Sequence, residues 1–140
     1  NPYFHELKGD IYKRSGRWQE AIVSLRQALK LSGDANLIRV ELAQALLATN
    51  NPATVDEATN LLRRSLVEDQ NSQAYRALGD AQYRQNKQPE AEASLAQAAY
   101  LEGDVKQAKT YAQRAKRGLT PGSPSALKMD DIIAYKPPAE

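Results

Sequence analysis

The residue types best suited to catalysis are scarce in this chain. It has one histidine and no cysteine, which leaves few candidates for a nucleophile, a general base or a metal ligand. His5 and Glu6 begin a string like the zinc-binding HExxH, in which two histidines four residues apart bind the metal from one face of a helix. The second histidine would stand at position 9, which is Gly9. We therefore expect no metal site and no cofactor, and we expect His5 to pack or to face solvent.

The other polar clusters do not indicate a reaction either. Glu68 and Asp69 are adjacent, as are Asp130 and Asp131, so on a helix their carboxylates point about 100° apart and cannot act on one substrate atom. Residues 118–123 lack the Lys-Ser/Thr pair and the preceding strand of a phosphate-binding loop. Cations near helix C-termini explain the basic clusters at 63–64 and 114–117. We predict that this chain is not an enzyme.

Composition limits the elements that could position a site. The 140 residues include 22 alanines and 16 leucines, but only five valines and five isoleucines. Alanine and leucine favour helices, whereas strands favour β-branched residues, so a mostly β fold is excluded. The absence of cysteine excludes a disulfide scaffold. A formal net charge of +2 gives no electrostatic reason to expect nucleic acid, and no apolar run reaches the roughly 18 residues of a membrane span.

Helix breakers recur at intervals that each fit one helix and a short turn. The spacing predicts eight helices, near residues 3–15, 18–31, 35–49, 54–69, 72–86, 89–102, 104–117 and 124–135. Thr54 and Glu57 have the spacing of a capping box, and Asp104 is placed to cap the helix that follows it.

A pattern of small residues repeats along these helices. The pattern Glu-Ala-x-x-x-Leu-x-x-Ala/Ser begins at Glu20, Glu57 and Glu90, and the pair Gly9-Asp10 recurs at Gly79. It resembles the tetratricopeptide repeat (TPR), in which small residues let two antiparallel helices approach closely. The resemblance implies an all-α fold, a TPR-type α-solenoid of antiparallel helix pairs with about eight helices. A plain helical bundle is the alternative.

The spacing of the repeated alanine sets the predicted repeats. From Ala21 to Ala58 the step is 37 residues and from Ala58 to Ala91 it is 33, but Ala108 follows after only 17. We predict one repeat domain over residues 1–135, with repeats near 2–34, 35–70 and 71–102, a degenerate half-repeat at 103–118, and a capping helix at 124–135. The helix near 89–102 would serve both the third repeat and the half-repeat. Residues 136–140 are expected to form a disordered tail.

Repeats of this kind enclose a concave groove lined by the first helix of each pair. The expected partner is therefore a protein or peptide, and tyrosine and arginine dominate such interfaces. Projection of the repeat also places Leu37 and Val40 in this groove. The residues predicted to bind a partner there are Tyr3, Asp10, Arg14, Gln44, Leu47, Arg76, Asp80, Tyr83, Arg84 and Tyr100.

A closer resemblance lies in the opening segment. Residues 1–10 (Asn-Pro-Tyr-Phe-His-Glu-Leu-Lys-Gly-Asp), residues 37–47, residues 56–64 and the triplet at 122–124 resemble the C-terminal repeat domain of BepA-like HExxH zinc metalloproteases. The resemblance implies a periplasmic location, a separate zinc-bearing protease domain, and a chaperone-like role in quality control of outer-membrane proteins. It implies as partners outer-membrane protein substrates, assembly machinery and the protease domain itself. Since the chain lacks HExxH, we do not expect it to hydrolyse peptides.

Two further readings stay open. The alternative function is a stand-alone TPR scaffold of an unrelated envelope or secretion assembly, and a cryptic enzyme would require a metal or cofactor that co-purifies with the chain. Because the chain opens on Asn1 rather than Met, we expect a fragment or a processed product. Ile132, Ile133 and Tyr135 form an apolar strip that could cover its own array or a neighbour's, so the oligomeric state stays open.

Overall fold

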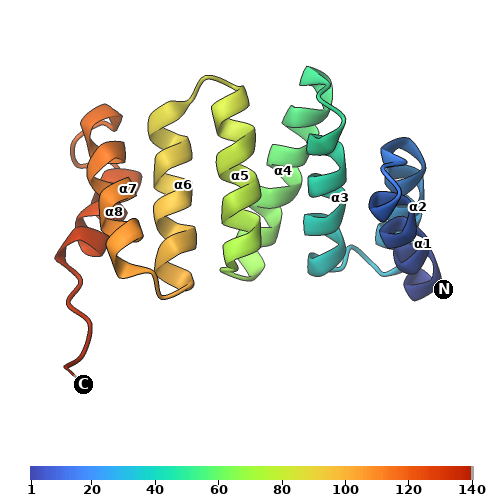
Figure 1. Ribbon diagram of the computed structural model, residues 1–140, viewed down its shortest axis with the longest axis horizontal. Helices are drawn as coiled ribbons and strands as arrows, with labels where there is room; N and C mark the ends of the chain where they lie inside the picture. The colour runs from blue at the N-terminus through green and yellow to red at the C-terminus, as the bar shows by residue number, and fades with distance from the viewer. Residues whose placement is uncertain (140) are drawn as a thin grey trace. The chain divides into compact units, whose positions relative to one another are not determined.

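The computed structural model describes residues 1–139, and it is built from helices and turns (Figure 1). Those residues form eight α-helices and no strand, which confirms the predicted all-α class. Every helix begins and ends within two residues of its predicted bounds. The helices are α1 (Pro2–Arg14), α2 (Trp18–Leu31), α3 (Asn36–Ala48), α4 (Pro52–Glu68), α5 (Ser72–Arg84), α6 (Gln88–Leu101), α7 (Val105–Gly118) and α8 (Pro124–Ala134).

The described residues after α8 form a short terminal segment. Residues 135–139 contain neither helix nor strand. The predicted tail spans 136–140, and its last residue lies outside the described part of the chain.

The chain divides into two compact units, and the boundary falls where the second and third predicted repeats meet. The first unit (Asn1–Gln70) holds α1 to α4, and the second unit, from Asn71 onward, holds α5 to α8. Within the first unit, each helix packs on the next one in the sequence. Within the second unit, α6 contacts α5, α7 and α8. Helix α6 therefore packs on both the helix before it and the helix after it, as α2, α3 and α7 also do.

Small residues allow close helix packing at the positions that the repeat pattern indicates. A Cβ atom placed on Gly9 of α1 would lie 2.8 Å from Cγ of Leu25 in α2, and one placed on Gly79 of α5 would lie 3.2 Å from Cγ of Leu95 in α6. A methyl group at Gly9 would therefore force the two helices or the leucine to move. The repeated alanines are fully buried: Ala21, Ala58, Ala91 and Ala108.

The core of the second unit is built mainly from alanine. Its largest members come from α8, where Met129 and Ile132 are buried against the small side chains of α6 and α7. Helix α8 thus covers an otherwise flat, apolar pair of helices. The buried cluster consists of Ala93, Ala96, Ala99, Ala108, Ala112, Ala115, Met129 and Ile132.

The start of α4 differs from the prediction. The helix begins at Pro52, and the side chain of Asn51 caps it by accepting a hydrogen bond from the amide of Ala53 at 3.0 Å. Thr54 lies inside the first turn, so the predicted capping box of Thr54 and Glu57 was wrong. Proline is favoured at the first helical position because no hydrogen bond needs its missing N–H there. Glu57 is not part of a helix cap and instead contacts a residue of another helix.

Candidate binding surfaces

The polar side chains do not form a metal site in the described part of the chain. Among residues 1–139, no group of three or more His, Cys, Asp or Glu side chains could hold a metal ion. His5 is half-buried, and its ring meets that of Phe4 edge-on with 5.5 Å between the ring centroids. None of the helices in these residues has the length and apolar character needed to cross a bilayer. The polar groups gather instead on exposed helix faces and around one cleft.

Helix α5 presents three of the predicted groove residues on one face. Arg76, Asp80 and Tyr83 follow each other at spacings of four and three, and all are exposed. Arg84 donates to Oδ2 of Asp80 at 3.0 Å, and Nε of Arg76 donates to Oε2 of Glu102 at 2.8 Å. The arginine beside Glu102 lowers the pKa of that carboxyl. Ion pairs therefore restrain the charged side chains, while the ring of Tyr83 stays 42% exposed.

Helix α7 adds Tyr111 and Arg114 to the same surface, and the sequence alone did not predict them. The guanidinium carbon of Arg114 lies 5.8 Å from the centroid of the Tyr111 ring. Burial raises the pKa of the Tyr83 hydroxyl, and the charges of Glu92 and Tyr111 add to the increase, while Arg114 opposes it. The charges of these two α7 residues therefore act on Tyr83 of α5 within the second unit. The sequence does contain a pattern that indicates these two residues, because Tyr111 and Arg114 alternate with the alanines that α7 buries.

Tyr100 of α6, another predicted groove residue, contacts the chain's own C-terminal segment. Its ring meets that of Tyr135 edge-on, with 5.2 Å between the centroids and 84° between the planes. Ile132 is buried in the core of the second unit, and Ile133 packs against that core. The predicted apolar strip therefore covers its own unit.

In the first unit, the exposed face of α3 is rotated from the predicted one. Val40 and Leu47, which the projection placed in the groove, are only 2% and 4% exposed and belong to the core. Leu37 is exposed, and Glu41 and Gln44 are half-buried, at the spacings of four and three that define one helix face. The correct face thus includes Glu41 and excludes Leu47.

Glu41 faces acidic groups of α1. Burial raises the pKa of the Glu41 carboxyl to about 7, and the neighbouring Glu6 adds to this through its charge and a hydrogen bond. Lys13 opposes the increase, and Asp10 adds a smaller repulsion. The predicted groove residues Asp10 and Arg14 form an ion pair with 2.9 Å between Oδ2 and Nε. The carboxyl groups of Glu6 and Asp10 in α1 therefore act on that of Glu41 in α3.

Helix α1 also carries an uncovered apolar face. Tyr3, predicted to bind a partner, is 78% exposed, and Phe4, Leu7 and Ile11 are more than half exposed. Positions 4, 7 and 11 form a continuous stripe along one side of the helix. Tyr3 is therefore accessible, but it stands beside an apolar stripe.

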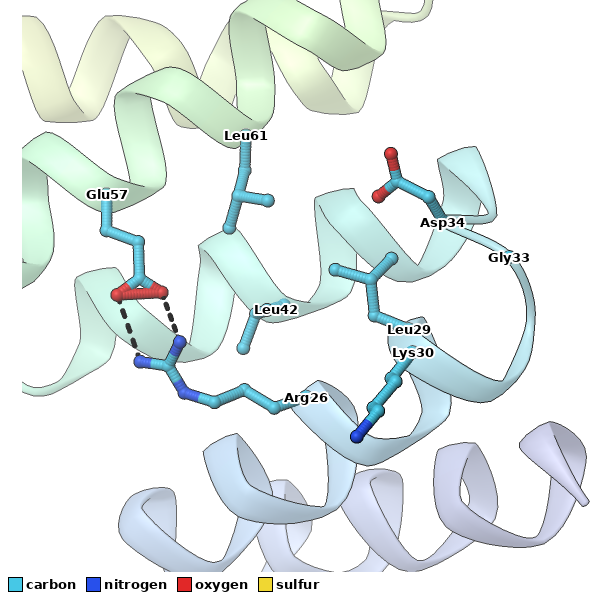
Figure 2. A pocket seen from close by; sticks show the side chains of 8 residues that line it. All are labelled: Arg26, Leu29, Lys30, Gly33, Asp34, Leu42, Glu57 and Leu61. Atoms are coloured by element: carbon cyan, nitrogen blue, oxygen red, sulfur yellow. Dashed lines mark hydrogen bonds and ion pairs between the residues drawn. The ribbon is translucent and has the colours of Figure 1, made fainter.

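A cleft of about 490 Å³ lies in the first unit between α2 and α4 (Figure 2). Leu29 of α2, Leu42 of α3 and Leu61 of α4 line it. At one end, Arg26 of α2 forms a bidentate ion pair with Glu57 of α4, at 2.6 Å and 2.9 Å. The other residues that line the cleft are Lys30, Gly33 and Asp34.

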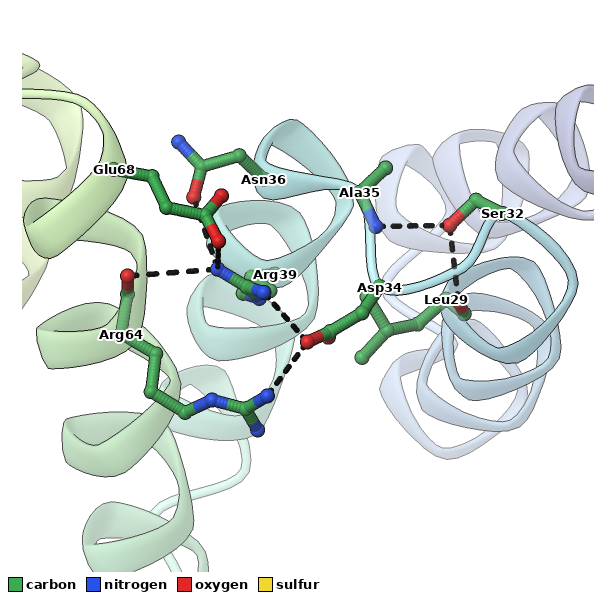
Figure 3. Close-up of polar contacts among 8 residues, drawn as sticks. All are labelled: Leu29, Ser32, Asp34, Ala35, Asn36, Arg39, Arg64 and Glu68. Carbon is green, nitrogen blue, oxygen red and sulfur yellow. Dashed lines mark hydrogen bonds and ion pairs between the residues drawn. The ribbon is translucent and has the colours of Figure 1, made fainter.

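A polar network fixes the turn between α2 and α3 (Figure 3). Asp34 has a φ of +73°, and its Oδ2 accepts hydrogen bonds from Arg39 at 2.5 Å and from Arg64 of α4 at 2.6 Å. Arg39 is buried and also pairs with Glu68 at 3.2 Å. The hydrogen bond from Arg39 is the main reason that the pKa of Asp34 is lowered. The charge of the buried Arg39 is thereby paired with two carboxylates, although its Nε has no hydrogen-bond partner, and the turn is tied to α4.

Comparison with known proteins identifies a repeat family in the first part of the chain. Residues 13–81 match the family model of the tetratricopeptide repeat. The matched segment contains all of α2, α3 and α4 and most of α5. No curated protein matches the chain.

Proposed function

We propose that this tetratricopeptide-repeat domain is a non-catalytic interaction domain that binds a protein partner along the exposed faces of α5 and α7. Repeats of this family typically mediate protein–protein contacts and typically carry no catalytic residues. The observation that carries the choice of surface is the face of α5 on which Arg76, Asp80 and Tyr83 are exposed together, with the charges of Tyr111 and Arg114 of α7 acting on Tyr83.

The chemistry of this surface suits a protein partner. Tyrosine and arginine are the residue types that most often dominate binding energy at interfaces. The ion pairs Arg76–Glu102 and Asp80–Arg84 already restrain their side chains, so less conformational entropy remains to be lost on binding. The exposed ring of Tyr83 then offers an amphipathic contact.

For the biological setting, we propose the periplasm and a BepA-like zinc metalloprotease. The domain would pack on the protease domain and dock outer-membrane protein substrates or assembly components in a chaperone-like way. The support is the resemblance of residues 1–10, 37–47 and 56–64 to the repeat domain of that family. Zinc chemistry would belong entirely to the protease domain.

Photocrosslinking from the groove tests the binding surface. A benzoylphenylalanine at position 83 of the natural full-length protein should crosslink one defined partner in cells, whereas the same group at Val67, an exposed position of α4, should not. The variant Arg76→Ala/Tyr83→Ala should capture at least ten-fold less of that partner, and the matched exposed variant Lys128→Ala should capture it normally. Unchanged capture by the double variant would rule out this surface.

The identity of the complete polypeptide tests the setting. An HExxH motif in the same polypeptide, together with recovery of the protein from the periplasmic fraction, is the expected result. Its absence would favour the alternative, a stand-alone scaffold of an unrelated envelope or secretion assembly.

A further inference from the structure

We propose that the first unit carries a second binding site, the cleft between α2 and α4, which takes a leucine-sized side chain of a protein partner and a carboxylate next to it. The cleft belongs to the second helices of the first two repeats. It involves none of the groove residues, so this proposal does not depend on the proposed function of the α5–α7 surface.

One face of α4 and one face of α2 form the two sides of the cleft. On α4, Glu57, Leu61 and Arg64 follow at spacings of four and three, so they share one face. On the opposite side, Arg26 and Leu29 of α2 share a face. Figure 2 shows Glu57 and Leu61 of α4 and Arg26 and Leu29 of α2 around the opening, together with Leu42 of α3, whereas Arg64 lies outside the cleft lining.

Ion pairs bridge both ends of the cleft. At one end Arg26 holds Glu57 through two hydrogen bonds, and at the other Arg64 holds Asp34, which the buried Arg39 also fixes (Figure 3). Bidentate and charge-assisted contacts restrain geometry more strongly than single neutral ones. The two ion pairs therefore tie α2 and the turn that follows it to α4 on either side of the cleft.

The interior of the cleft is apolar. Leu42 and Leu61 are buried and Leu29 is half-buried, so a guest meets three leucine side chains. A volume of about 490 Å³ falls in the range of sites that take compact ligands. Enclosed pockets surround a small molecule on most sides, whereas this cleft opens broadly to solvent. An open cleft of this size fits a side chain presented by another polypeptide.

The charges around the cleft determine which chemical group of the partner can lie next to its bound apolar side chain. Glu57 is neutralised by Arg26, and Asp34 is neutralised by two arginines. Lys30, an exposed residue of α2, forms no ion pair with any residue in the described part of the chain. The rim therefore offers one uncompensated positive charge beside an apolar site. A partner with a carboxylate adjacent to its apolar side chain is complementary to both, and the charge contributes mainly to selectivity.

Peptide titrations followed by methyl NMR test the proposal on the complete 140-residue chain. The probe is the acetylated and amidated peptide Gly-Ser-Leu-Asp-Ser-Gly, with an Ala-for-Leu and a Lys-for-Asp version as comparisons. We expect the Leu-Asp peptide to shift the methyl signals of Leu29, Leu42 and Leu61 with a millimolar or lower Kd. The two comparison peptides should bind at least five-fold more weakly.

Two variants separate the apolar and the charged contributions. Lys30→Glu should weaken the Leu-Asp peptide at least five-fold and strengthen the Leu-Lys peptide, while Lys128→Glu, on the exposed surface of α8, should change neither. Leu29→Phe should fill the cleft and weaken the Leu-Asp peptide at least ten-fold, with an unchanged far-UV circular dichroism spectrum. Absence of shifts at 5 mM peptide, equal binding of all three peptides, or shifts confined to methyl signals of the second unit would overturn the proposal.

Discussion

Removing the charge of Glu41 is expected to stabilise the first unit at neutral and alkaline pH. Burial, the neighbouring Glu6 and, to a smaller extent, Asp10 raise the pKa of the Glu41 carboxyl in the folded chain to about 7, against the opposing effect of Lys13. The folded state therefore holds a proton that the unfolded state releases near pH 4.5. By linkage, the free energy of unfolding falls as the pH rises from about 4.5 to about 7 and is flat above that.

The size of the effect follows from the difference in pKa. A pKa of about 7 against an ordinary value of 4.5 corresponds to at most about 3.5 kcal/mol, at about 1.4 kcal/mol for each pH unit. Glu41 is half-buried, and solvent screens part of this interaction. We expect Glu41→Gln to raise the free energy of unfolding by about 1–3 kcal/mol at pH 8 and to change it little at pH 4.5. The glutamine amide can still donate a hydrogen bond to Glu6.

Urea denaturation between pH 4.5 and pH 8 measures this difference. The single tryptophan, Trp18, lies in α2, so its fluorescence reports the unfolding of the first unit. Glu90→Gln, an exposed position of α6, is the matched control and should leave the pH dependence unchanged. If Glu41→Gln has the same pH dependence as the original chain, or is no more stable at pH 8, the assigned cause is wrong.

Three further substitutions probe packing and the polar network. Gly9→Ala should lower the free energy of unfolding by about 1–3 kcal/mol in urea titrations, because the added methyl group would lie 2.8 Å from the fully buried Leu25. Arg39→Met should lower it by only about 1 kcal/mol in the same titration, because the carboxylates of Asp34 and Glu68 that it leaves are open to solvent and Asp34 keeps Arg64. Met129→Ala should cost about 2–5 kcal/mol by circular dichroism, because it empties the largest space in an alanine core.

Each of these substitutions has a control of similar chemistry. Gly79→Ala meets its neighbour at 3.2 Å and should cost less than the change at position 9. Arg63→Met and Leu127→Ala alter exposed side chains and should stay within about 0.5 kcal/mol of the original chain. A buried variant that behaves like its exposed control would contradict the packing described for that site.

The helices could be predicted because the signals that define them are local. Alanine and leucine set the helical preference, and glycine, proline and asparagine mark the turns. The predicted cap Asp104 is confirmed by its hydrogen bond from the amide of Gln107 at 3.1 Å. At α4 two local signals competed, and Asn51 followed by Pro52 outweighed the capping-box spacing of Thr54.

The binding surfaces were harder to predict because they depend on contacts between helices. On α3, positions three and four residues apart lie almost equally close to one face, so the sequence did not decide between Leu47 and Glu41. The cleft depends on Arg26 and Glu57, which are 31 residues apart. Sequence does not indicate which of 19 basic residues pairs with a given carboxylate.

The order in which the helices pack has a consequence for the time course of folding. Within each unit nearly all helix contacts join neighbours in the sequence, and such local topologies fold in microseconds to milliseconds because little loop-closure entropy is lost. During synthesis α1 to α4 can therefore form as they emerge. The contact of α6 with α8 is the exception, since it skips one helix. The second unit must wait for Met129 to leave the ribosome before its core closes, and that arrival is the last step of its folding.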